Sequence, residues 1–113
     1  MVHRPLYIDF SLYAHGDPDF KKELIKMMVS DLMELQQSLQ LSFRFNEISF
    51  YKRVCNKINS TLNMLDDREF IDIVEEIKSD NSNEEKAASF NRLCVEIVNS
   101  LEANQNEKNP RLN

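Results

Sequence analysis

Residues 17–41 read DPDFKKELIKMMVSDLMELQQSLQL and form the longest segment with one continuous helical pattern. Its apolar side chains recur at steps of three and four residues, which is the period of a helix that buries one side. Asp17 is a favourable N-cap, and Pro18 suits the first helical position. We therefore predict a helix over Pro18–Leu41 whose apolar stripe is wide enough to need more than one neighbouring helix. The stripe consists of Phe20, Leu24, Ile25, Met27, Met28, Val29, Leu32, Met33, Leu35 and Leu39.

The same helical period appears on either side of this stretch. Ser42–Ile48 is interpreted as a connector. Short connections make successive helices antiparallel neighbours. We therefore expect an all-α fold, an antiparallel up-down-up-down four-helix bundle with a short extra N-terminal helix. The other predicted helices are Leu6–Ala14, Ser49–Leu65, Asp67–Lys78 and Asn83–Leu101.

Length and composition favour one helical domain. The chain has 113 residues, of which 42% are hydrophobic, and this suits a single core. One glycine and three prolines leave few sharp turns, which disfavours hairpin-rich β folds and glycine-rich phosphate loops. We expect a single domain over residues 1–113, with a core from about residue 6 to residue 101 and a flexible tail over 102–113.

Charge and motif content exclude several function classes. The formal net charge is −5, which argues against a nucleic-acid binder. The apolar runs are far shorter than the roughly 20 residues that span a bilayer, and the N-terminus lacks a secretory pattern. Cys55 and Cys94 are interpreted as buried thiols in a reducing compartment, so a cytoplasmic location is expected. Neither metal-ligand spacing nor a nucleotide motif appears, so we expect no metal and no cofactor.

The predicted third helix carries a polar stripe. Its members fall within about 60° of one another at 100° per residue, and they are Lys52, Asn56, Asn59 and Asn63, with Ser60 beside them. Residues 46–65 hold three cations against one carboxylate, whereas residues 66–78 hold six acids against two cations. The stripe is therefore either a plain solvated surface or a basic face that steers toward an acidic partner.

Two segments carry a family resemblance. The run Gly16-Asp17-Pro18-Asp19-Phe20 with the long helix after it, and residues 51–65, YKRVCNKINSTLNML, resemble histidine phosphotransfer (HPt) domains over about residues 6–80. The family signature is a phosphorylatable histidine, any residue, an apolar residue, lysine, then a small residue and often serine. The resemblance implies a helical phosphorelay protein that docks on response-regulator receiver domains or histidine kinases.

The chain departs from this signature at its reactive positions. Asn56 stands where the family has its histidine, and Asn59 stands where the family has its lysine. An amide nitrogen is delocalised into its carbonyl, so Asn56 forms hydrogen bonds but cannot hold a phosphoryl group. The resemblance therefore implies a degenerate HPt domain, not an enzyme, that binds a receiver or kinase module without passing phosphate. Its expected partner-binding face consists of Lys52, Arg53, Asn56, Lys57, Asn59, Ser60 and Asn63.

The sequence also allows two other interpretations. Phosphotransfer through His15 or His3 is disfavoured, because neither lies on the helix where the family places its histidine. The alternative function is a helical adaptor or oligomerisation bundle unrelated to phosphorelay, although a monomer is expected. An aromatic cluster bears on that alternative: it is expected to pack beneath the connector, and an exposed part of it would be an interface. The cluster consists of Phe43, Phe45, Phe50 and Tyr51.

Overall fold

The computed structural model describes residues 4–80 and 83–106, and in these residues it contains helices and no strand. The prediction of an all-α fold is thus confirmed for the described part of the chain. The helices are α1 (Phe10–Ala14), α2 (Pro18–Phe45), α3 (Ser49–Lys57), α4 (Asn59–Leu65), α5 (Arg68–Ser79) and α6 (Glu84–Asn106).

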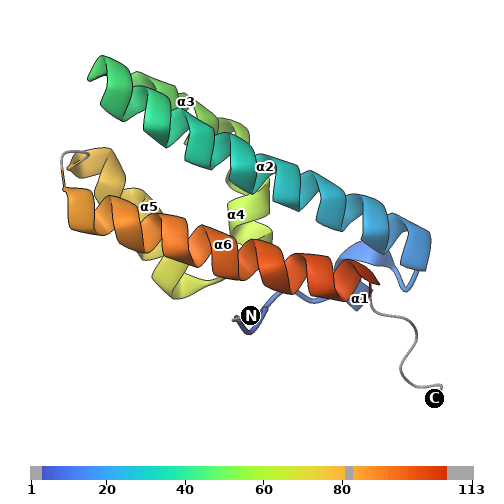
Figure 1. Cartoon of the computed structure of the whole chain (residues 1–113). Coiled ribbons are helices and arrows are strands. Elements are labelled where there is room, and N and C mark those ends of the chain that lie inside the picture. The colour runs from blue at the N-terminus through green and yellow to red at the C-terminus, as the bar shows by residue number, and fades with distance from the viewer. Residues whose placement is uncertain (1–3, 81–82, 107–113) are drawn as a thin grey trace.

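The long helices lie side by side and alternate in direction. α2 packs against α1, α3 and α6, and α5 packs against α6. Figure 1 shows α2 running from right to left, α3 returning beside it, and α6 crossing back alongside α2. The α2–α3 connection and the α5–α6 connection therefore lie at the same end of the molecule, and α1 lies at the other end.

The core is built from one cluster of buried side chains among the described residues, to which each long helix contributes. Three fully buried aromatic side chains meet in it. The Phe70 and Phe90 rings stack at a centroid distance of 5.8 Å, and the Tyr51 ring meets Phe90 edge to face at 6.1 Å. These contacts join α3, α5 and α6 and hold α3 at a fixed position.

The start of α2 follows the sequence, but several helix ends do not. The Asp17 carboxylate accepts the Asp19 N–H at 2.9 Å, as an N-cap should. α2 continues to Phe45 instead of ending at Leu41, because Asn46 supplies a left-handed C-cap at φ 52°. The expected tail from residue 102 is wrong up to Asn106, where α6 ends, and residues 107–113 lie outside the described residues.

The first predicted helix is also shorter than expected. Only Phe10–Ala14 is helical. The described segment before it is not helical, and Arg4 attaches this segment, the N-terminal strap, to the rest of the protein. The Arg4 backbone N–H and C=O both bond the Ser100 hydroxyl at 2.6 Å. Its guanidinium binds the Asp67 carboxylate at 2.6 Å and 3.1 Å. The N-terminal segment therefore ties the start of α5 to α6.

Three members of the predicted apolar stripe are exposed. Phe20 is 49% exposed, Met27 41% and Met33 51%. They lie at the edges of the stripe, whereas its centre, including Met28, Leu32 and Leu35, is fully buried. The stripe is therefore wider than the surface that the neighbouring helices cover.

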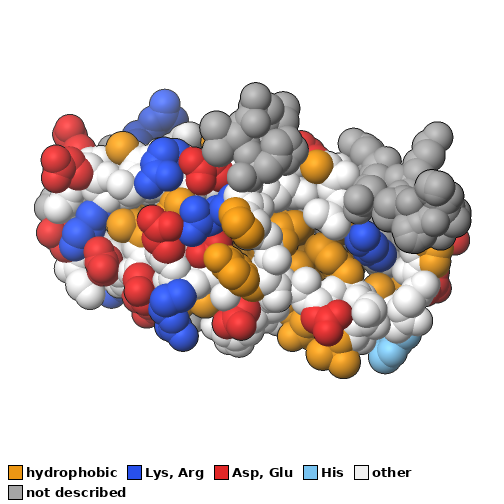
Figure 2. Space-filling model, turned by 90° about the horizontal axis from the view of Figure 1, so that it is seen from below, with side chains coloured by type: hydrophobic (Ala, Val, Ile, Leu, Met, Phe, Trp, Pro, Cys, Tyr) orange, Lys and Arg blue, Asp and Glu red, His pale blue; other side chains and the backbone are white. Residues whose placement is uncertain are grey.

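Charged and hydrophobic side chains are unevenly distributed on one face of the molecule (Figure 2). Figure 2 shows acidic and basic side chains interleaved at the end that carries the α5–α6 connection, and hydrophobic side chains gathered toward the other end. Exposed apolar side chains of the N-terminal segment include Tyr7 at 61% and Leu12 at 64%. Across residues 4–80 and 83–106, no helix combines the length and apolar character needed to cross a bilayer.

Candidate partner-binding face

The candidate face follows α3 and α4, which the sequence predicted as one helix over Ser49–Leu65. That prediction is wrong at Ile58, whose backbone (φ −101°, ψ 19°) leaves the helical region. Neither glycine nor proline marks the break. Two hydrogen bonds carry the chain through it, from the Ile58 N–H to the Val54 carbonyl at 2.9 Å and from the Leu62 N–H to the Ile58 carbonyl at 3.2 Å.

All seven residues of the predicted face are exposed. They are divided between the two helices, so the predicted stripe crosses the break at Ile58. Tyr51, Cys55 and Ile58 point inward and are at most 2% exposed. α3 carries Lys52, Arg53, Asn56 and Lys57, and α4 carries Asn59, Ser60 and Asn63.

Polar contacts with α2 fix the position of the two helices. The buried Ser42 hydroxyl accepts the Tyr51 N–H at 3.1 Å, which satisfies a free donor in the first turn of α3, where Ile48 offers no side-chain cap. The buried Thr61 hydroxyl donates to the Asp31 carboxylate at 2.6 Å. These contacts were not predicted, although a serine and an acid at the edge of an apolar stripe are the signals that would have drawn attention to them.

One of the predicted cations is already paired. The Lys57 ammonium lies 2.9 Å from the Glu34 carboxylate on α2, so its charge is largely balanced. Lys52 and Arg53 have no carboxylate within ion-pair distance among the residues that the structure describes. The basic character of the face therefore comes from Lys52 and Arg53.

The centre of the face presents hydrogen-bonding groups to solvent and keeps its thiol buried. Asn56 offers an amide donor and acceptor to solvent. The neighbouring thiol of Cys55 is buried, which raises its pKa to about 11 and makes it a poor nucleophile near neutral pH. No group of three or more His, Cys, Asp or Glu within the described ranges is arranged to hold a metal ion. His15 is exposed on the α1–α2 connection, and His3 lies outside the described residues.

The aromatic cluster does not pack as predicted. Tyr51 is buried, but Phe43 is 40% exposed and Phe45 is 60% exposed. The Phe45 and Phe50 rings lie 6.1 Å apart at the tip of the α2–α3 hairpin. The expected packing beneath a connector fails because α2 continues through Phe45, which places this side chain on the outside of a helix end.

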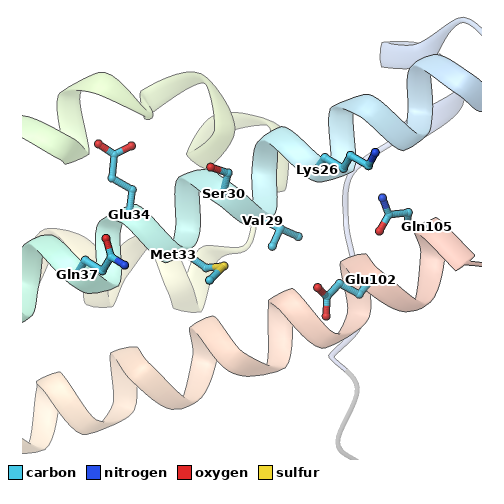
Figure 3. A pocket seen from close by; sticks show the side chains of 8 residues that line it. All are labelled: Lys26, Val29, Ser30, Met33, Glu34, Gln37, Glu102 and Gln105. Atoms are coloured by element: carbon cyan, nitrogen blue, oxygen red, sulfur yellow. The ribbon is translucent and has the colours of Figure 1, made fainter.

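An open groove of about 600 Å³ separates the middle of α2 from the last turns of α6. In Figure 3 the Val29 and Met33 side chains point toward α6, whereas the Glu34 carboxylate points away from it. This groove is a mixed polar and apolar surface without a nucleophile–base pair. Its lining consists of Lys26, Val29, Ser30, Met33, Glu34, Gln37, Glu102 and Gln105.

No protein-family model, curated protein or solved structure matches this chain.

Proposed function

We propose that the protein is an HPt-like phosphorelay protein that binds a receiver domain or a histidine kinase without carrying phosphate. In this proposal the helices form an antiparallel up-down-up-down four-helix bundle, preceded by the short helix α1, and the protein acts in the cytoplasm. The proposal rests on the resemblance of residues 51–65 to the HPt signature. The partner-binding face is the exposed surface of α3 and α4.

One observation carries the proposal. Asn56, which in the resemblance matches the family histidine, is exposed on α3, while its neighbour Cys55 is buried. A side chain at this place is accessible to an incoming domain. Its amide can contact that domain but cannot accept a phosphoryl group, so recognition is separated from transfer.

Binding and phosphate acceptance test the two halves of the proposal separately. Isothermal calorimetry against the receiver and kinase modules of the same organism should detect binding by the natural protein. Incubation with a phosphorylated receiver should then leave the natural protein unlabelled, because Asn56 has no nucleophilic nitrogen. The double variant Asn56→His/Asn59→Lys should gain an acid-labile phosphoryl label.

The controls separate this function from its alternatives. Absence of binding heat with every module would reject the proposal and leave the adaptor or oligomerisation function, which sedimentation across concentrations then tests. A label on the natural protein that disappears in His15→Ala would reject the silent role of Asn56. Failure of the double variant to accept phosphate, with binding retained, would reject the HPt-like geometry of the site.

A further inference from the structure

The tip of the α2–α3 hairpin combines exposed aromatic rings with unpaired cations. Phe45 is 60% exposed, Leu41 is 39% exposed, and the half-buried Phe50 ring lies 6.1 Å from the Phe45 ring. Large exposed aromatic side chains of this kind supply most of the energy of protein interfaces when a partner covers them.

The cations of the protein are unevenly paired. Of the twelve Lys and Arg side chains that the structure describes, four have neither an ion pair nor an aromatic contact within that part of the chain. Three of the four, Arg44, Lys52 and Arg53, are exposed residues of the hairpin, and the fourth is Lys22. Residues 41–57 hold four cations against one carboxylate, in a chain whose net charge is −5.

The aromatic tip adjoins the predicted partner-binding face. Residues three and four positions apart share one side of a helix, so Phe50, Arg53 and Lys57 follow one another along α3. Phe50 precedes Asn56 by six residues, about 9 Å along the helix axis at 1.5 Å per residue. A domain that covers Arg53 and Lys57 together with Asn56 would therefore reach the aromatic tip as well.

We propose that the hairpin tip is the anchor of the partner interface, and that it takes a protein surface with an apolar recess ringed by carboxylates. The identity of that partner as a receiver or kinase module rests on the proposed function. Phe45 and Phe50 fill the recess, and Arg44, Lys52 and Arg53 pair with its acidic rim. We choose a partner surface with an acidic rim because its carboxylates would complement the unpaired cations of the hairpin tip.

A second copy of the chain fits the tip less well. A two-fold dimer places the same patch of each subunit against the other. Such pairing would set Arg44, Lys52 and Arg53 of one copy against the same cations of its partner. Like charges brought together in this way oppose association, so an acidic partner is the better occupant.

The test compares matched variants in calorimetry with the receiver and kinase modules used above. Phe45→Ser and Arg53→Glu should weaken binding by about tenfold or more, as removal of an interface anchor does. The controls are Leu12→Ser, an equally exposed apolar residue in α1 at the far end of the molecule, and Lys22→Glu, the remaining unpaired cation. Both controls should change affinity by less than about twofold, and circular dichroism should show all four variants folded.

Each outcome decides the inference. A loss of binding affinity in Phe45→Ser and Arg53→Glu, but not in the two controls, supports the inference. Equal binding by all variants rejects the hairpin tip as the anchor of the interface and leaves the proposed function intact. Absence of binding by the natural protein rejects the proposed function and, with it, the hairpin tip as an anchor. A dimer of the protein alone, dissociated by Phe45→Ser in sedimentation, overturns the acidic partner in favour of a second copy.

Discussion

At the scale of single residues, Tyr51 links the candidate face to the core. It is fully buried, and its hydroxyl donates to the Val74 carbonyl of α5 at 2.9 Å. Burial raises the pKa of this hydroxyl, which therefore stays protonated and remains a donor. Its neighbours Lys52 and Arg53 are exposed to solvent on α3. Tyr51 thus holds in place the helix that presents the two unpaired cations.

Removal of the Tyr51 hydroxyl should destabilise the fold without emptying the core. Tyr51→Phe keeps the ring against Phe90 and loses one net hydrogen bond, so we expect a fall of about 1 kcal/mol in the free energy of unfolding. Urea denaturation followed by circular dichroism measures this change. Tyr7→Phe, at a 61% exposed tyrosine, is the matched control and should leave the midpoint unchanged. An unaltered midpoint for Tyr51→Phe would contradict the structural role of its hydroxyl.

The sequence predicts which side chains face solvent better than it predicts their partners. Helical periodicity was enough to place Lys52, Asn56 and Asn59 outward, because burial on a helix repeats with a fixed angle. The pairing of Lys57 with Glu34 was out of reach, since it joins residues 23 positions apart and depends on how α2 and α3 pack. The exposure of Phe45 was missed for a related reason: it depends on where α2 ends, and the local sequence did not indicate that end.

At the scale of elements, the side-chain caps of α2 and α5 were predictable, whereas the Asp9 cap of α1 was missed because that helix was predicted from Leu6. Asp17 and Asp67 each accept N–H groups two or three residues ahead, and both starts were placed from sequence within a residue. The α2 C-cap at Asn46 was missed because the segment after Leu41 lacks the apolar repeat. The break at Ile58 carries neither glycine nor proline, and its local signal is the polar run Asn59-Ser60-Thr61 that follows it.

Asp67 caps α5 and also anchors the N-terminal strap. Its carboxylate accepts the Phe70 N–H at 3.2 Å and binds the Arg4 guanidinium. Asp67→Asn keeps a capping oxygen but loses the charged partner of Arg4, so we expect a loss of about 1.5–3 kcal/mol at pH 7. Thermal and urea unfolding measure it. Asp66→Asn, at the exposed neighbour, is the control and should change little.

The cost of Asp67→Asn should depend on pH in a defined direction. Burial opposes ionisation of Asp67, but hydrogen bonds from Arg4 and the Phe70 N–H outweigh it, and its pKa lies below the ordinary value of 3.8. A lowered folded pKa gives stability that is present above about pH 4 and is lost as pH falls through the folded value. The gap between the natural protein and the variant should stay constant from about pH 7 to 5 and shrink below about pH 4. A gap that widens in acid would contradict the assignment.

At the scale of the whole molecule, one segment has a charge opposite in sign to the net charge of the protein. The protein measures 50 × 27 × 20 Å, and residues 41–57 of the α2–α3 hairpin hold four cations against one carboxylate, although the net charge is −5. A basic segment on a protein of net negative charge produces an uneven field, which would orient the proposed acidic partner before contact. In this proposal the positions of the charged residues influence the orientation in which a partner approaches, as well as how tightly it binds.

Orientation by charge should appear as a salt-dependent association rate. If an acidic module docks on the hairpin, its association rate constant should fall by roughly tenfold between about 0.05 and 0.5 M NaCl, while dissociation changes little. Stopped-flow or surface plasmon resonance measures both rates. The double variant Lys52→Gln/Arg53→Gln should associate more slowly at low salt and lose most of this dependence. The same slope in natural protein and variant would place the steering charges elsewhere, because only cations that face the partner contribute to the approach.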